Sequence, residues 1–114
     1  MDKIAGVSRT PPPSGFARSS AVSSEQVRAL PAIGQQAMHR LERCIKTHHV
    51  AEVDYTDAEG RRSAIRLRPA YIRSNAAHHV VVWGLPSDAE HWEELRLDRI
   101  HAVRDTGERF EPTW

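Results

Sequence analysis

Between residues 35 and 48 the apolar positions recur with the period of an α-helix. They are spaced at i, i+3, i+7 and i+10, while charged residues fill the other faces. This pattern predicts an amphipathic helix whose apolar side packs against the rest of the domain. The apolar stripe consists of Met38, Leu41, Ile45 and His48, with Ala37 and Cys44 beside it.

After this helix the period changes to two, which is typical of β-strands. In the segment 50–56, Ala51, Val53 and Tyr55 share one face. The residues that follow end in Gly60, which can adopt a positive φ, and they predict a turn. The further segments predicted to be extended are 62–68, 71–73, 78–85 and 94–98.

Three local features refine these strands. Pro69 lacks a backbone donor and predicts an edge or a bend. The run Val80-Val81-Val82-Trp83 is continuously apolar, which predicts a strand covered on both faces. Ile100 and Val103 resume the core at a spacing of three, which requires a tight bend or bulge near Asp98-Arg99.

One helix followed by about five short strands in roughly 65 residues limits the architecture. We expect a mainly β domain of the α+β class. An N-terminal helix would precede a small, strongly bent five-stranded sheet. Closure of this sheet into a barrel would remove its exposed edges.

The N-terminal part has a different composition. Residues 1–24 are rich in proline and serine and poor in large apolar side chains, which predicts a disordered tail. The alternative is that Pro11-Pro12-Pro13 forms a polyproline II ligand for a groove-type domain. Ser23 and Gln26 have the spacing of a capping box, which predicts a short helix ended by Pro31. The predicted divisions are a tail at 1–34, a domain at 35–111 and an end at 112–114.

Composition bounds the class of protein. The 114 residues suffice for one domain, and the net charge of +1 requires any basic surface to come from local clustering. Cys44 is the single cysteine, so no intramolecular disulfide can form. No apolar run approaches the length of a membrane helix, and the N-terminus lacks the apolar stretch of a secretory signal. A soluble cytoplasmic protein with no membrane partner is therefore expected.

An ordered set of positions between about Leu41 and Phe110 resembles the WYL domain family. The most specific piece is Leu95-Arg96-Leu97-Asp98-Arg99-Ile100, which is similar to the family's FRLDRI segment. The resemblance implies an Sm-like, SH3-type five-stranded barrel preceded by a helix. It also implies a role in bacterial regulation, because WYL domains typically sense nucleic-acid or nucleotide ligands beside an effector domain. The other matching positions are Ile45, Val50, Val53, Tyr55, Gly60, Ile65, Leu67, Pro69, Tyr71, Ile72 and Val80–Trp83.

The chain departs from the family pattern at specific positions. The name-giving Trp-Tyr-Leu triplet falls on His79-Val80-Val81. Two positions that often hold arginine in the family are Ile65 and Glu93 here. No winged helix is predicted before the domain. The sequence therefore predicts a stand-alone, divergent member of the family.

Several arginines are candidates for a ligand site. Arg66, Arg68 and Arg96 alternate with core leucines and isoleucine, so they project outward from their strands. Guanidinium groups match phosphate oxygens, and an aromatic ring can stack on a base. Arg99 is the position that the resemblance implies most strongly as a ligand contact. The predicted ligand-binding residues are Arg66, Arg68, Tyr71, His79, Arg96 and Arg99, with Arg73 and Trp92 nearby in sequence.

Two other interpretations of these arginines remain open. The outward face can be ordinary solvated surface, neutralised by nearby Asp98, Glu93 and Glu94. Asp98 and Arg99 can also form a salt bridge that fixes the predicted bend.

The sequence favours no catalytic, metal or cofactor site. The seven histidines show no HExxH-type spacing, and adjacent histidines on a strand point to opposite faces. Cys44 lies on or beside the apolar helix face and is expected in the core. Asp54, Asp57 and Glu59 cluster near a turn, where carboxylates usually interact with solvent and the turn itself. A protein that is not an enzyme is expected.

The leading hypothesis is a regulatory or sensory module that binds a nucleotide or single-stranded nucleic acid through outward arginines. The alternative is a protein–protein interaction module, with a protein partner or as a homodimer, and with no nucleic-acid ligand. A contiguous positive patch would favour the first hypothesis, and interleaved acids would favour the second.

Overall fold

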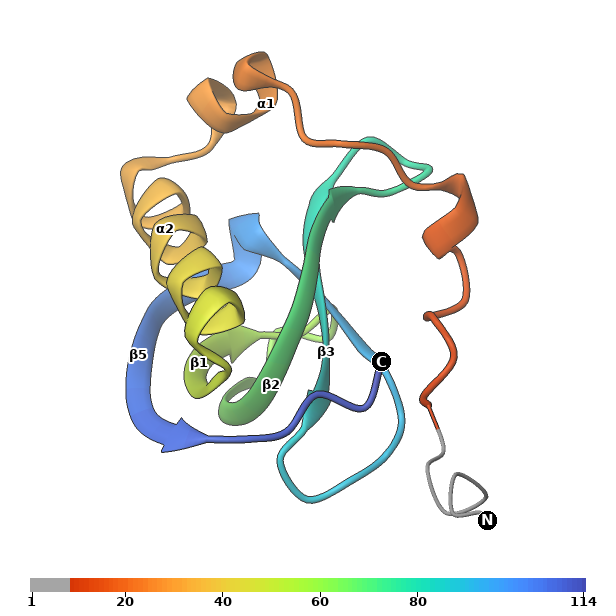
Figure 1. The fold of residues 1–114 in the computed structure, drawn as a ribbon. Coiled ribbons are helices and arrows are strands. Elements are labelled where there is room, and N and C mark those ends of the chain that lie inside the picture. Colours follow the sequence, from red (N-terminus) through yellow and green to blue (C-terminus); the bar gives the residue numbers. More distant parts are fainter. Residues whose placement is uncertain (1–8) are drawn as a thin grey trace, which may run out of the picture.

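The computed structural model describes residues 9–114 (Figure 1). Short helical segments come first and a sheet follows. None of the helices within the described residues is long and apolar enough to cross a membrane. In chain order the elements are η2 (Phe16–Arg18), α1 (Ser24–Ala29), α2 (Ala32–Thr47), β1 (His49–Thr56), β2 (Arg62–Ser74), β3 (Val80–Pro86), β4 (Glu93–Arg96), η3 (Leu97–Arg99) and β5 (Ile100–Arg109).

Helix α2 confirms the helical period and begins earlier than predicted. It starts at Ala32, directly after Pro31, whose fixed φ suits an N-cap position. His48 ends it in the left-handed conformation, with φ 58°. The buried residues of α2 are Gly34, Ala37, Met38, Leu41 and Cys44, while Ile45 and His48 are only partly buried.

The capping box predicted before α1 is present. The Ser23 side chain accepts a hydrogen bond from the Gln26 backbone N–H at 3.1 Å, and the Gln26 side chain accepts one from the Ser23 N–H at 3.0 Å. Both bonds satisfy backbone donors that have no partner within the helix. The box thereby fixes where α1 begins.

All neighbouring strands of the five-stranded sheet are antiparallel, in the order β4-β3-β2-β1-β5. β2 is one strand of 13 residues that runs through Pro69, where the predicted strands 62–68 and 71–73 join. Its pairing with β3 shifts between Pro69 and Tyr71, so the expected bend is a β-bulge. The second predicted bend is the 3-10 turn η3 between β4 and β5.

The prediction of a closed barrel is wrong, although the α+β class is confirmed. Within residues 9–114, no ladder of hydrogen bonds joins β4 to β5. β4 has only four residues, and η3 redirects the chain before it pairs with β5. The Arg96 N–H instead donates to the Tyr55 hydroxyl of β1 at 3.1 Å. A side chain therefore takes over the role that a strand partner would have in a closed barrel.

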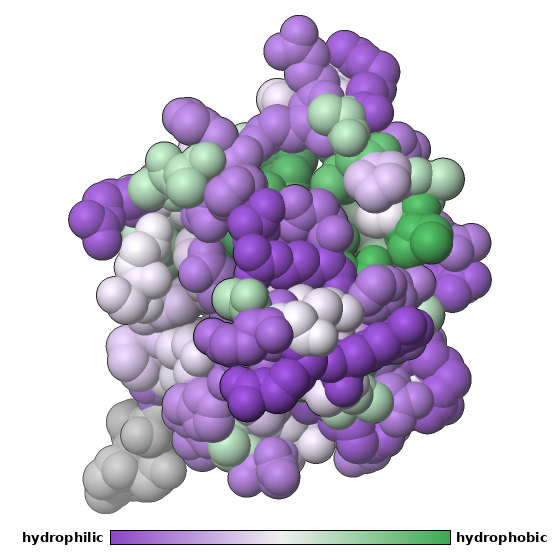
Figure 2. All heavy atoms as spheres, turned by 180° about the vertical axis from the view of Figure 1, so that it is seen from behind, coloured by the Kyte–Doolittle hydropathy of each residue, from purple (hydrophilic) through white to green (hydrophobic). Residues whose placement is uncertain are grey.

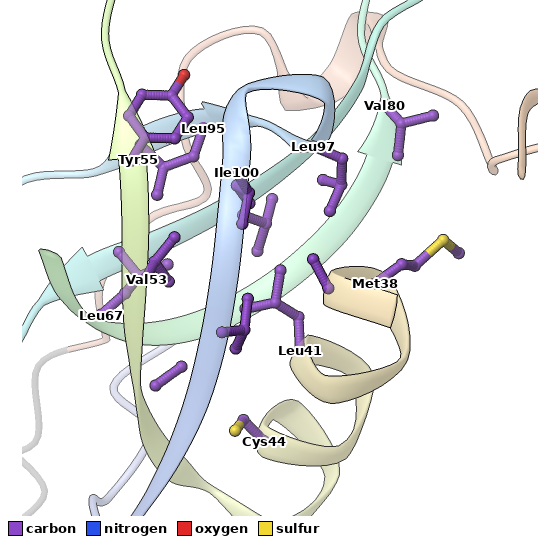
Figure 3. Packing of buried hydrophobic residues seen from close by; sticks show 14 residues of the cluster. Met38, Leu41, Cys44, Val53, Tyr55, Leu67, Val80, Leu95, Leu97 and Ile100 are labelled. Atoms are coloured by element: carbon purple, nitrogen blue, oxygen red, sulfur yellow. The ribbon is translucent and has the colours of Figure 1, made fainter. Parts of the chain in front are cut away.

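The core lies between α2 and the inner face of the sheet. The apolar side chains of α2 point toward the strands, where Val53, Leu67 and Ile100 meet them (Figure 3). Leu41, Leu67 and Leu97 are fully buried. The alternation predicted for β1 is confirmed, since Ala51, Val53 and Tyr55 are buried while their neighbours Glu52 and Asp54 are half-buried.

The outer face of β3 is covered as well, which explains its continuous apolar run. The segment from Arg9 to Val22 runs beside the sheet on the side away from α2 (Figure 1). Phe16 packs on Tyr71 and Trp83, with ring centroids 4.7 and 5.9 Å apart. Ser20 and Ser74 form an isolated antiparallel bridge. Where the sequence predicts a disordered tail, residues 9–24 lie against the sheet; residues 1–8 of that prediction lie outside the described residues. The division at residue 34 stays a prediction.

Much of the molecular surface carries paired charges. Figure 2 shows a face on which hydrophilic side chains predominate, with hydrophobic residues gathered toward its upper part. Arginines of the sheet pair with acids on neighbouring strands or in neighbouring segments. These pairs are Arg62–Asp54, Arg66–Glu108 and Arg104–Glu52.

Candidate ligand site

Two of the predicted arginines are engaged within the protein. Arg66 forms an ion pair with Glu108 of β5. The Arg68 side chain is only 12% exposed and donates to the carbonyl oxygens of Pro86 and Ala89, at 2.9 and 2.6 Å. It also reaches a Glu90 carboxylate oxygen at 3.0 Å. Arg68 therefore holds the loop between β3 and β4, a role that strand alternation does not reveal.

The predicted arginines do not form one patch. Register places Arg73 beside Val81 and Val81 beside Arg96, so Arg73 and Arg96 lie in one row across the sheet. Arg66 precedes Arg73 by seven positions on β2. Seven residues of strand span about 23 Å. Arg66 and Arg96 consequently lie toward opposite ends of the sheet, and Glu108 and Asp98 neutralise them separately.

Three predicted residues do converge, around the Asp98 carboxylate at the turn after β4. Arg96 donates to both carboxylate oxygens of Asp98, at 3.0 and 2.6 Å. His79 and Arg99 are close enough to act electrostatically on the same carboxylate. The predicted Asp98–Arg99 salt bridge is wrong, because the partner of Asp98 is Arg96. Arg96 is the extended residue directly before η3, and its guanidinium reaches Asp98 within that turn.

These contacts lower the pKa of Asp98. The hydrogen bond from Arg96 is the largest cause, partial burial opposes it, and the charges of Arg96, His79 and Arg99 lower the pKa further. Half-buried Arg99 makes no side-chain hydrogen bond or ion pair with any residue in the range 9–114. The cluster thus holds two guanidinium groups against one carboxylate, with a histidine beside them.

A small hollow lies next to this cluster. Its volume is about 180 Å³, and the connection between α1 and α2 forms one wall. Enclosed ligand sites usually measure about 300–1,000 Å³. The hollow is therefore too small to enclose more than a phosphate-sized group, and neither Arg96 nor Arg99 lines it. Its lining residues are Gln26, Ala29, Leu30, Pro31, His78, His79, Val80 and Asp98.

The loop before β3 fixes the position of His79. The Asn75 side-chain oxygen accepts hydrogen bonds from the backbone N–H groups of Ala77 and His79, at 3.0 and 2.9 Å. His78 adopts a positive φ of 66°, which turns the chain into β3. Gln26 approaches from α1, donating to the Ser74 hydroxyl at 2.8 Å. The sequence signalled only the capping role of Gln26 and gave no sign that it borders the site.

Tyr71, the remaining predicted residue, lies elsewhere. Its ring packs between Phe16 and Trp92, at centroid distances of 4.7 and 5.9 Å. The structure thus brings together His79, Arg96 and Arg99, and it separates Arg66, Arg68 and Tyr71 from them.

The described residues give little support to a metal site or to a reactive cysteine. No group of three or more His, Cys, Asp or Glu side chains gathers there in a form suited to a metal ion. Cys44 is fully buried, and burial raises the pKa of its thiol to about 11. Asp57 accepts hydrogen bonds from the backbone N–H groups of Glu59 and Arg61, so it builds the β1–β2 turn.

A groove of about 900 Å³ was not predicted. It lies between basic residues of α2 and the strands β1 and β5. Its charges are mixed, since Arg40 and Arg43 face Asp105, and Glu52 pairs with Arg104 at 2.8 Å. Arg40 also donates to the Val103 carbonyl at 3.1 Å, so this arginine caps the exposed edge of β5.

The Asp98 contacts make stability pH-dependent. A carboxyl whose folded pKa lies below its unfolded value of about 3.9 contributes stability above that pH and loses it as pH falls through the folded pKa. We expect the urea midpoint of Asp98→Asn to lie below that of the wild type at pH 7, and the gap to shrink as the pH falls below about 4. Asp88→Asn, in an exposed loop, should follow the wild type throughout. A gap that stays constant or widens as the pH falls would contradict this assignment.

Comparison with known proteins shows what the fold resembles. No protein-family model matches the chain. The fold is similar to part of the proteasome accessory factor B/C (PafBC) of Arthrobacter aurescens, with a TM-score of 0.61 and 15% sequence identity over 81% of this chain. The chain spans 13% of the length of that protein. At this level of identity the likeness shows a common fold, of one main helix and a five-stranded antiparallel sheet.

Proposed function

We propose that this chain is a WYL-like regulatory or sensory module that binds a nucleotide or single-stranded nucleic acid around Arg99. The observation that carries the proposal is the convergence of His79, Arg96 and Arg99 on one carboxylate beside a phosphate-sized hollow. The WYL-like order of residues and a fold shared with part of a proteasome accessory factor support it. We propose binding, and not catalysis, as its activity.

The chemistry of the cluster suits phosphate. Arg99 has no ion pair within residues 9–114, so its guanidinium can accept an anion without first breaking a contact. Arg96 is shared with Asp98, and a phosphate oxygen can compete with that carboxylate for the guanidinium fork. For single-stranded nucleic acid, two arginine–phosphate contacts give a slope of about −1.4 when the logarithm of the association constant is plotted against the logarithm of the salt concentration. Affinity should thus fall about sevenfold between about 50 and about 200 mM salt.

Replacing Arg99 with alanine tests this site. We expect Arg99→Ala to weaken binding of a fluorescein-labelled oligothymidylate about tenfold and to halve the salt slope, because one charge-assisted contact is lost. Fluorescence anisotropy over a salt series measures both quantities. Arg104→Ala is the matched control, since it removes the same charge from a guanidinium already paired with Glu52. Equal effects of the two changes, or binding that does not depend on salt, would refute the proposal.

A protein-interaction module is the second candidate. The acids interleaved with Arg66, Arg96 and Arg104 favour it, because they leave no contiguous positive patch along the sheet. Strand β4 pairs with β3 alone among the described strands, so a partner strand or a second copy can add to its other edge, whereas Arg40 caps the edge of β5. Sedimentation velocity over a concentration series distinguishes self-association from a monomer that binds only oligonucleotides.

A further inference from the structure

A row of aromatic rings runs along the outer surface of the domain, away from the Asp98 cluster. Neighbouring rings lie between 4.7 and 5.9 Å apart, within the range of favourable aromatic contacts. The row joins the middle of the sheet to both ends of the described chain. In order its members are Trp83, Phe16, Tyr71, Trp92, Trp114, Phe110 and His48.

The chain's own proline run contacts this row through one backbone carbonyl, and Pro11 and Pro12 are exposed. The Trp92 indole N–H donates to the Pro11 carbonyl at 2.8 Å. Pro13 is buried, although it belongs to a segment with few large apolar residues. Just before the prolines, the Thr10 backbone N–H and hydroxyl contact the Thr113 carbonyl and hydroxyl, at 2.5 and 2.6 Å.

This arrangement has the chemistry of proline-rich peptide recognition. A polyproline II segment has no internal hydrogen bonds, so its carbonyl groups remain available to donors on a partner surface. The proline rings of such a segment pack between aromatic side chains. A tryptophan indole N–H can donate to a carbonyl of the segment, so no exposed strand edge is needed as the donor. Tyr71, Trp92 and Trp114 provide adjacent rings, and Trp92 also provides the donor.

The segment is held apart from the core. The buried core cluster is built from α2 and the strands, and none of residues 9–21 belongs to it. The prolines themselves receive one hydrogen bond from the domain, that of Trp92. The anchors further along are Phe16 on Tyr71 and Trp83, the Arg73 side chain on Ser19, and the Ser20–Ser74 bridge. The prolines can therefore leave the aromatic row while α2 and the sheet stay packed.

We propose that Tyr71, Trp92 and Trp114 form a binding site for a proline-rich segment of a partner protein, which Pro11-Pro12-Pro13 occupies in the free chain. The chain's own prolines compete at the high effective concentration of a tethered ligand, so a partner binds weakly until they are displaced. The site goes beyond the proposed ligand site at Arg99 and does not depend on it.

A peptide with the sequence of residues 9–14, blocked at both ends and labelled, tests the proposal in trans. The receptor is the full chain carrying Pro11→Ser, Pro12→Ser and Pro13→Ser, which removes the three proline rings that compete with the peptide and keeps Phe16 and all three aromatic rings. We expect this variant to bind the peptide at least about tenfold more tightly than the wild type does. Adding Trp92→Phe should then weaken binding about three- to tenfold, because the ring remains and the N–H donor is lost.

Controls make each outcome decisive. A peptide in which serine replaces all three prolines should not bind. In the triple variant, the Trp92 indole N–H resonance should shift toward its position in the wild-type chain when the unlabelled proline peptide is added in excess. Equal affinity of the wild type and the triple variant, no effect of Trp92→Phe, or an indole resonance that does not move would each overturn the proposal.

Discussion

Replacing Gly84 with alanine is expected to lower the free energy of unfolding by about 3 kcal/mol. A Cβ atom at this position would lie 2.5 Å from the Arg68 carbonyl oxygen and 2.8 Å from the Leu67 Cγ atom. The first contact is with backbone, and the second is with a fully buried side chain in the core. Neither can withdraw without moving β2 away from β3 at the bulge beyond Pro69. Urea unfolding followed by circular dichroism measures the loss.

Gly34→Ala is the matched control for this change. Gly34 is also buried, but its added Cβ would meet its first neighbour, the Leu30 Cβ atom, at 3.4 Å. Alanine favours a helix over glycine by up to about 1 kcal/mol, so this variant should be as stable as the wild type or more stable. Similar losses for the two variants would show that β2 and β3 are not as close as the structure has them.

The change Leu41→Ala is expected to cost about 3 kcal/mol, because it removes a fully buried side chain and leaves a cavity. Leu41 points from α2 into the cluster that includes Val53 and Leu67 (Figure 3). Strands and helix contribute to this cluster together, so surrounding groups can refill the space only in part. The loss is measured as a shift of the urea midpoint at constant slope.

Ile33→Ala provides the comparison for Leu41, on the same helix and with another large aliphatic side chain. Ile33 is 53% exposed, so its truncation should change stability by no more than about 0.5 kcal/mol. A loss at Ile33 as large as that at Leu41 would mean that α2 is rotated relative to the sheet.

The elements of the domain are predictable because burial imposes a period on the sequence. Ala51, Val53 and Tyr55 alternate along β1, and each is buried as expected. The spacing between Ile100 and Val103 required a bend or bulge, and the pairing of β5 with β1 shifts by one residue between Ile100 and Ala102. Each of these inferences depends on residues close together in the chain, because the regular geometry of one strand or turn decides which of its side chains face the core.

Contacts between segments that are far apart in the chain were harder to predict from the sequence. Alternation along β2 identified Arg68 as outward but could not show that the β3–β4 loop folds over it. Closure of the sheet would require β4 to pair with β5, and the Arg96 N–H of β4 donates to the Tyr55 hydroxyl of β1 instead. The apolar run of β3 did predict a cover on both faces. The segment that covers the outer face is the one carrying Phe16. Its sequence gave no sign of this role beyond one aromatic ring in a proline-rich stretch.

The proximity of three candidate site residues has the same local origin. His79 directly precedes β3, Arg96 ends β4 and Arg99 ends η3, and these elements adjoin. Arg66 belongs to the other end of β2 and pairs with Glu108 near the end of the sheet's last strand. The segment before α2 borders both proposed sites, through Pro11 at Trp92 and through Gln26 and Leu30 at the hollow.

The most direct test of the ligand site is a titration of the ¹⁵N-labelled full chain with a short oligothymidylate, followed through its amide resonances. We predict that the resonances of His79, Asp98 and Arg99 shift together and saturate, and that those of Glu52 and Arg104 on the β1–β5 surface do not move. Resonances around Asp98 that stay in place while the oligonucleotide binds elsewhere, or the absence of any shift, would contradict a nucleotide or nucleic-acid site at Arg99.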